Sequence, residues 1–494
     1  MLILAGVSIA TLTGENGILT KANDASEKTS KVTAKEKVEL EVAGSYGTDG
    51  RINTESLNEN LRNIEGLTSG LPIEFLPATV EVDGYLITIL KDGNVVLGKV
   101  DGNFDEEKGV NSPKLTNNMQ LVIYENGKWV ADETNSEYSY EAQTGATDTY
   151  NEETGEYGTS HWANAMLDGN YYVWIPRYAY RIDKNTQYTS QSGTSYKIDV
   201  KFLVGVTNQY YDENGELKDA KIATNADEIS AEGNTDYYVH PAFTFGNTEL
   251  EGLWIGKYES SDAGSDKIAI VPNAMSLRNI NVSTMFSRAQ TLSKTNIDAH
   301  MLKNIEWGAV AYLTQSQYGR NGTEVSVNQC SSYITGAGRE IGTEIDNPIY
   351  NSTYDSSEIT DDQRYNGEIG KLSSTTGNVY GIYDMSGGAY EYVMGVYGIN
   401  GSPTVGSSGF ETFPDSKYYN LYATTSANNT NIGDALYETR GWNSDDADFV
   451  DSSYPFVIRG GYCKSTSVAG VWGFYYYNGY NYGIYGFRVC LAVK

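Results

Sequence analysis

The sequence predicts an α+β protein in which a long N-terminal helix leads into a small β module and then into one large domain with many irregular loops. Three observations predict this class. An uncharged apolar start is continued by apolar residues at helical spacing, and an Asp-Gly pair separates two β-prone runs. Beyond residue 119, aromatic segments typical of strands alternate with loops of Asn, Ser, Gly and Thr.

Composition limits the function. With 64 Asp and Glu against 35 Lys and Arg, the chain has a net charge of −29. This charge disfavours a nucleic-acid partner and is typical of a soluble surface protein. The few cysteines and histidines match no metal or redox motif, so we expect no cofactor and no metal. They are Cys330, Cys463, Cys490, His161, His240 and His300. One disulfide, for example between Cys463 and Cys490, is compatible with the sequence but is not assigned by it.

The helix is predicted over residues 1–45. Residues 1–14, MLILAGVSIATLTG, carry no charge, and apolar side chains such as Ile18 and Ala22 then recur among charged ones. The apolar part is shorter than a membrane span and lacks the features of a secretory signal. The words LILAGVSIATLTGENGILTKANDASEKT resemble the N-terminal helix of type IV pilin-like proteins, in which a leader and more apolar residues come first. The resemblance implies a truncated pilin-like helix; the alternative is an amphipathic helix packed on its own domain.

The middle of the chain is predicted as a small α+β module over residues 46–105 and a linker over 106–118. Residues 91–94, KDGN, lie between two apolar stretches and predict a β-hairpin. The large domain then covers residues 119–494. We expect a strand pair around LVIYENGKWV, an aromatic strand run in YYVWIPRYAYRI and a helix in AHMLKNIEWGAVAYLTQSQYG.

Three motifs in order identify a resemblance for this large domain. They are residues 377–393 (GNVYGIYDMSGGAYEYV), residues 459–461 (RGG) and residues 486–488 (GFR). Together they resemble the formylglycine-generating-enzyme-type sulfatase-modifying domain, a variant of the C-type lectin fold. The enzymes of that family use two cysteines five apart, shortly after the RGG turn. Here Cys463 stands early and its partner position holds Val468, so we expect no enzymatic activity.

The C-terminal residues 459–494 have an unusual composition, with seven tyrosines, seven glycines and no acidic residue. Successive side chains of a strand face opposite ways, so Tyr475, Tyr476 and Tyr477 cannot all enter one core, and at least one ring faces outward. Tyr with Ser, Gly and Asn is typical of recognition surfaces. The alternative is a Tyr-rich sheet edge or a packed C-terminal hairpin.

The same tail resembles the variable proteins of diversity-generating retroelements, in which RGG, AGVW and GFRV are fixed and the residues between them are rewritten from a template repeat at adenines. The resemblance implies a diversified, ligand-binding face, and each candidate residue is Asn or can be reached from an Asn codon through adenine changes; Lys464 cannot. The candidates are Tyr462, Cys463, Ser465, Ser467, Gly473, Tyr475, Tyr476, Tyr477, Asn478, Tyr480, Asn481, Tyr482, Ile484 and Tyr485.

The predicted function is therefore a receptor or adhesin displayed on the cell surface, with an unknown protein or glycan ligand on another cell, a phage or a host. Pilin-like self-assembly and membrane attachment through the complete N-terminal helix are further expectations. The acid-free tail predicts an acidic or carbohydrate-bearing partner. The alternatives are a minor pilin with a decorative domain and an oxidoreductase of the formylglycine-generating type. Calcium binding by Asp445, Asp446, Asp448 and Asp451 is a weaker alternative to an acidic surface loop.

Overall fold

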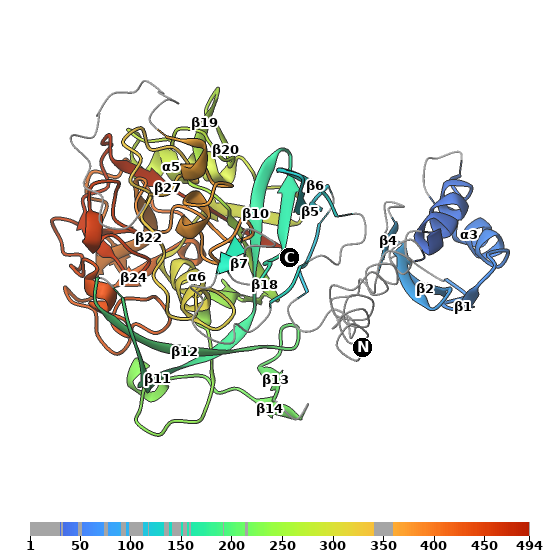
Figure 1. Ribbon diagram of the computed structural model, residues 1–494, viewed down its shortest axis with the longest axis horizontal. Coiled ribbons are helices and arrows are strands. Elements are labelled where there is room, and N and C mark those ends of the chain that lie inside the picture. Colours follow the sequence, from blue (N-terminus) through green and yellow to red (C-terminus); the bar gives the residue numbers. More distant parts are fainter. Residues whose placement is uncertain are drawn as a thin grey trace, which may run out of the picture. The chain divides into compact units, whose positions relative to one another are not determined.

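Figure 1 shows the computed structural model of the chain. The structure describes residues 30, 33–47, 52–73, 78–89, 95–97, 112–116, 118–132, 138–140, 150–151, 156–157, 160–190, 192–212, 216–339 and 359–493. The chain divides into two compact units, Met1–Gly109 with Asp132–Glu137, and Val110–Ala131 with Tyr138–Lys494.

The first unit has helical structure and one antiparallel sheet in the order β1-β2-β3-β4. The predicted hairpin across residues 91–94 is confirmed, because Ile89 pairs with Val95, although the loop itself lies outside the described residues. A second hairpin turns at Asp83 and Gly84, both at positive φ, as in the tight turns that suit twisted strands. Its elements are residues 33–43, α3 (Thr54–Leu61), β1 (Leu67–Ser69), β2 (Ala78–Val82), β3 (Tyr85–Ile89) and β4 (Val95–Leu97).

The predicted α+β class with a long N-terminal helix is wrong. Strands dominate the described residues. Among the described residues of the predicted segment, helical structure covers residue 30 and residues 33–43. The helix ends at Gly44, which favours a turn, and Tyr46 then forms a bridge with Ile52. Residues 1–29, which carry the apolar start, lie outside the described residues. Among the described residues, no helix combines the length and apolarity needed to cross a membrane.

The second unit contains a seven-stranded antiparallel sheet in the order β21-β28-β18-β10-β9-β5-β6. The predicted strand pair around residues 120–131 is confirmed as β5 and β6, and the aromatic run forms β10 and the start of β11. The strands of the sheet are β5 (Gln120–Glu125), β6 (Lys128–Ala131), β9 (Asn164–Leu167), β10 (Asn170–Pro176), β18 (Gly252–Gly256), β21 (Ile297–Met301) and β28 (Val489–Val493).

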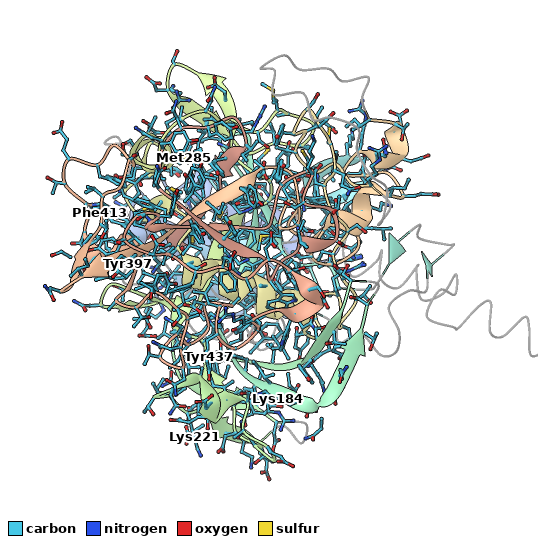
Figure 2. All side chains as sticks on the ribbon, turned by 90° about the vertical axis from the view of Figure 1, so that its left-hand side faces the viewer. Lys184, Lys221, Met285, Tyr397, Phe413 and Tyr437 are labelled. Atoms are coloured by element: carbon cyan, nitrogen blue, oxygen red, sulfur yellow. The ribbon has the colours of Figure 1, made fainter. Side chains whose placement is uncertain are left out.

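A second sheet runs β23-β22-β25-β26, with β24 and β27 paired in parallel to β22. Its reddish ribbons face the viewer in Figure 2, with Tyr397 of β22 labelled. The strands are β22 (Tyr390–Ile399), β23 (Ser402–Pro403), β24 (Asn420–Tyr422), β25 (Phe456–Arg459), β26 (Phe474–Tyr477) and β27 (Tyr485–Phe487). Since β27 belongs to this sheet and β28 to the larger one, the C-terminal segment joins both sheets.

Smaller elements complete the unit. A third sheet has the order β12-β11-β15, with β11 (Tyr178–Thr189), β12 (Thr194–Phe202) and β15 (Tyr238–Val239). Four short hairpins are β7 (Tyr150–Asn151) with β8 (Glu156–Tyr157), β13 (Gln209–Tyr211) with β14 (Leu217–Asp219), β16 (Thr244–Phe245) with β17 (Thr248–Glu249), and β19 (Ser261–Gly264) with β20 (Lys267–Ala269). The α-helices are α4 (Ala226–Ile229), α5 (Val282–Gln290) and α6 (Asn304–Gln315).

Helix α6 is buried on almost every side and contacts β10, β12 and β22. Its first turn is closed by Glu306, whose carboxylate accepts from the backbone N–H of Lys303 at 2.8 Å. The predicted helix over residues 299–319 is confirmed only for α6, because the residues before Lys303 pair with β28 as strand β21. Apolar residues are buried both in β21 and in α6, so the spacing of apolar residues could not separate strand from helix.

Candidate ligand-binding surface

The RGG motif is the turn that follows β25. Gly460 and Gly461 have φ of +81° and +74°, a region that glycine occupies without strain. A Cβ on Gly461 would lie 2.7 Å from the Cβ of Ala469. Hydrogen bonds from Gly460 N to Gly473 O and from Gly470 N to Gly460 O, both 3.2 Å, close the turn. The two glycines therefore allow residues 462–473 to fold back onto the end of β25.

Arg459 holds residues 462–473 from the protein interior. Its guanidinium is buried, lies over the rings of Trp307 at 5.3 Å and Phe474 at 5.7 Å, and donates to the carbonyls of Ala435 and Val471 at 3.3 and 3.4 Å. Burial lowers the pKa of Arg459 to about 10. The Val471 carbonyl also accepts from the indole N–H of Trp307 at 2.8 Å. A residue of α6 and a residue of β25 thus hold the same point of the loop.

Arg488, from the GFR motif, connects the two sheets. It donates to the Gly256 carbonyl of β18 at 2.7 Å and to Glu391 of β22 at 3.1 Å, and it is completely buried. Burial, opposed by the charge of Arg488, raises the pKa of Glu391 to about 7. The motif residues Arg459 and Arg488 therefore have structural roles. Neither reaches the surface.

The predicted scaffold residues of the tail are buried, and most of the candidate binding residues are not. Val471, Trp472, Phe474, Phe487 and Val489 are all 6% exposed or less. Ser467, Asn481 and Tyr482 are exposed. Seven other candidates are half-buried: Tyr462, Tyr475, Tyr476, Tyr477, Asn478, Tyr480 and Ile484. All three tyrosine rings of β26 keep part of their surface in solvent, as the alternation argument requires for at least one.

Four candidates lie inside the protein and cannot touch a ligand in this conformation. They are Cys463, Ser465, Gly473 and Tyr485. Ser465 accepts the backbone N–H of Tyr462 at 3.1 Å and so supports the turn. Tyr485, which is 3% exposed, is a strand residue of β27 and pairs with Tyr390. A sequence pattern of codons does not distinguish these positions from their exposed neighbours.

The tyrosine rings contact one another in a continuous network. Tyr475 and Tyr476 stack with centroids 4.6 Å apart and ring planes at 12°. Tyr477 contacts Tyr480 at 5.2 Å and Tyr485 at 4.8 Å. We call the accessible part of this network the tyrosine surface. It comprises Tyr390, Tyr454, Tyr462, Tyr475, Tyr476, Tyr477, Tyr480 and Tyr482.

Two members of the tyrosine surface come from outside the tail. Tyr390 of β22 stacks on Tyr462 with centroids 5.1 Å apart, and Tyr454, which is 40% exposed, contacts Tyr476 at 5.3 Å. Sequence reasoning assigned Tyr390 only to a fold motif and did not select Tyr454. The position of Tyr454 shortly before β25, next to Pro455, was the available signal that its ring lies at a strand end. Pairing of β26 with β25 brings it beside the tail.

The surface has an acidic edge that the tail's composition did not predict. Asp446 donates its backbone N–H to the Val468 carbonyl at 3.1 Å, and its own carbonyl accepts from Phe474 N at 2.8 Å. Asp448 is exposed, and its charge contributes to the raised pKa of Tyr475, after the hydroxyl contact with Tyr476 and burial. The tail itself is free of acids, yet two carboxylates from the preceding loop lie beside it.

The three cysteines lie inside the protein. Cys330, Cys463 and Cys490 are all buried and carry free thiols. Burial raises the pKa of Cys463 to about 12, so its thiol is protonated at neutral pH. Val468 lies in the 3-10 turn η7 (Thr466–Val468), which leaves Cys463 without the second thiol of the enzyme family.

One group of metal-ligating residue types lies close together among the described residues: His300, Glu306 and Cys490, with ligand atoms within 4.8 Å of one another. These side chains are already engaged. His300 Nε2 is 3.1 Å from Glu306 Oε1, and Lys303 Nζ is 3.3 Å from the same oxygen. Burial raises the pKa of Glu306, but the charges of Lys303 and His300 outweigh this effect and lower the pKa to about 2. The ammonium of Lys303 already neutralises Glu306, and the group is buried. These observations favour an internal ion-pair network over a metal site.

Asp445, Asp446, Asp448 and Asp451 do not form a calcium cage in this structure. Asp445 is buried and accepts the backbone N–H of Trp472 at 3.0 Å, and Asp451 caps a turn by accepting from Ser453 and Tyr454. The predicted acidic surface loop therefore describes only Asp446, Asp448 and Asp451. Two cavities of about 440 and 520 Å³ are lined by residues outside the tyrosine surface.

Comparison with known proteins gives a limited result. No protein-family model matches the chain, and no curated protein matches it. Among solved structures, the chain is similar to the Major Tropism Determinant M1 variant, with 12% identity, coverage of 87% of this chain and 84% of that chain, and a TM-score of 0.24. The P3c variant gives 11% identity, the same coverage and a TM-score of 0.25. TM-scores this low do not establish a common fold.

Proposed function

We propose that this chain is a ligand-binding surface protein and that the tyrosine surface is its contact face. One observation carries the proposal. Within residues 459–493, the residues predicted as scaffold are buried, while tyrosines that Tyr390 and Tyr454 join into one network keep their rings partly in solvent. Tyrosine rings give a large contact area at a small entropic cost, and exposed groups of them mark recognition surfaces. A packed core hairpin would bury these rings.

We further propose that a diversity-generating retroelement rewrites this face. The exposed and half-buried candidates are Asn or residues reachable from Asn codons by adenine changes. Trp472, which is buried in the scaffold, is not reachable in this way. Substitutions at exposed positions usually change the free energy of unfolding by about 0.5 kcal/mol or less. The genomic test is a near-copy of the codons for residues 459–494, differing at adenines and close to a reverse-transcriptase gene. A genome without such a copy would remove the diversification proposal and leave the binding proposal.

The partner we propose is a protein or glycan on another cell, a phage or a host, met at the cell surface. The several partly exposed rings of the tyrosine surface suit contact with a macromolecule, because tyrosines give a large and rigid contact area. We propose binding rather than catalysis because the thiol of Cys463 is buried and protonated. Oxygen consumption by the copper-loaded chain with a cysteine-containing peptide would support the enzymatic alternative.

The binding proposal is tested with a triple variant, Tyr475→Ser, Tyr476→Ser and Tyr482→Ser. A glycan array and a panel of intact bacterial cells are screened with the parent chain, and each ligand found is measured again with the variant. The matched control is Tyr211→Ser with Tyr437→Ser, two tyrosines that are 43% and 37% exposed outside the tyrosine surface. We expect the triple variant to lose at least tenfold in affinity and the control to bind as the parent does. Equal binding by all three proteins would refute the proposal.

A further inference from the structure

The acidic edge of the tyrosine surface is built by a segment that runs beside β26. Asp448 N donates to the Phe474 carbonyl at 3.1 Å, and Phe474 N donates to the Asp446 carbonyl at 2.8 Å. Ala447 forms a parallel bridge with Phe474. This pairing fixes the backbone of residues 446–448 against the strand that carries Tyr475. The two carboxylates are therefore held at the edge of the surface by the fold itself.

Among the described residues, these carboxylates have no positive partner. Within the part of the chain that the structure describes, neither Asp446 nor Asp448 forms a hydrogen bond or ion pair through its side chain. Burial, and then the charge of Asp448, raises the pKa of Asp446. Lys464 is the partly exposed basic residue of the same tail, and it makes no ion pair with either. Two like charges that repel each other stay uncompensated next to the rings.

The rings beside them suit a cation. The charge of Asp448 acts on Tyr475 and that of Asp446 on Tyr390, so each carboxylate lies near one partly exposed ring. A Lys or Arg group placed over a tyrosine face gains from the ring quadrupole, and a neighbouring carboxylate adds to this attraction. The net charge of −29 also draws a basic surface toward the protein over a longer range.

We propose that the partner of the tyrosine surface is a protein that presents Lys or Arg side chains to the rings of Tyr475 and Tyr390, beside Asp448 and Asp446. This inference rests on the proposed function and specifies the chemistry of its partner. It replaces the acidic partner predicted from the tail's composition, because the tail does not supply the whole surface. An acidic partner would meet Asp446 and Asp448 as like charges.

The test uses immobilised synthetic peptides with four arginines separated by Gly-Ser, and the same peptides with citrulline or glutamate at those four places. The full chain is compared with the double variant Asp446→Asn and Asp448→Asn. The control, Asp361→Asn with Asp362→Asn, removes the same charge from two exposed residues of the 3-10 turn η3 (Asp361–Gln363). Asparagine keeps the size of the side chain, and urea unfolding shows that each variant folds.

We expect the parent to bind the arginine peptide at least tenfold more tightly than the citrulline peptide at low salt. The Asp446 and Asp448 variant should lose about tenfold, as expected for two partly exposed ion pairs beside an aromatic ring, and the control less than twofold. Equal losses in both variants would show attraction by net charge alone and overturn the inference. If those losses are equal while the triple tyrosine variant still loses its cell or glycan ligand, the cationic partner is wrong and the binding function stands.

Discussion

The division of the tail into scaffold and surface predicts very different costs for the same substitution at two nearby aromatic residues. Phe474 is 2% exposed and packs under the Arg459 guanidinium, so Phe474→Ser should cost about 3–5 kcal/mol, the usual loss for a buried phenylalanine. Tyr482 is 41% exposed, and its ring contacts the rings of Tyr480 and Tyr485, each at a centroid distance of 5.9 Å. Tyr482→Ser should cost about 1 kcal/mol, because edge contacts in solvent contribute less than buried ones.

Urea unfolding followed by tryptophan fluorescence measures this difference. All seven tryptophans belong to the second unit, so the signal reports that unit alone: Trp129, Trp162, Trp174, Trp254, Trp307, Trp442 and Trp472. The expected difference between the two variants is about 3 kcal/mol in the free energy of unfolding. Similar costs for both, whether small or large, would refute the division, since the tail would then be uniformly loose or uniformly packed.

Three further predictions follow from buried groups and turns. Gly461→Ala should lower the free energy of unfolding by about 3 kcal/mol or more, and Gly441→Ala by about 1 kcal/mol. Both glycines have φ near +74°, but only a Cβ at Gly461 would clash, against Ala469. Equal unfolding midpoints for the two variants would contradict this prediction. Burial raises the pKa of Glu438 from 4.5 to about 7, so its contribution to stability is full below pH 4.5 and falls by about 3 kcal/mol as the pH rises through 7. Between pH 4 and 8, the free energy of unfolding in urea should therefore decline less for Glu438→Gln than for the parent. Parallel curves for the two proteins would contradict a raised pKa of Glu438. Lys257→Met should cost about 3 kcal/mol or more in the same assay, because it leaves the oxygens of Asn164, Val379 and Gly381 without a donor; a neutral result would show that water replaces the ammonium.

The sequence was most informative where a local rule was enough. A turn signal at residues 91–94 predicted the pairing of β3 with β4, and β-prone aromatic runs predicted β5, β6 and β10. Such signals depend on neighbours within a few residues. The burial of Phe474 and Trp472 beside half-exposed tyrosines agrees with an alternation of fixed and variable residues read from one short segment.

Signals that depend on distant parts of the chain failed. The predicted fold class gave the N-terminal helix too much weight, because strand pairing between distant segments makes the protein mostly β. Residues 297–301 have the apolar character of the following helix and yet form β21, because an edge of the large sheet is there to pair with. Asp446 and Asp448 could not be placed beside the tyrosines, since only tertiary pairing with Phe474 brings them there.

The same network limits how freely the proposed variable positions can change. Tyr482 touches two rings and solvent, so its replacement disturbs little around it. Tyr485 contacts Tyr390, Tyr392, Tyr477 and Tyr482, is almost fully buried, and forms part of β27. A small residue at this position would leave a cavity beneath the tyrosine surface and loosen the rings above it. A codon that can be rewritten is therefore not enough to make a position variable. Selection on the fold should hold Tyr485 aromatic, while Tyr475, Tyr476 and Tyr482 change to suit a partner.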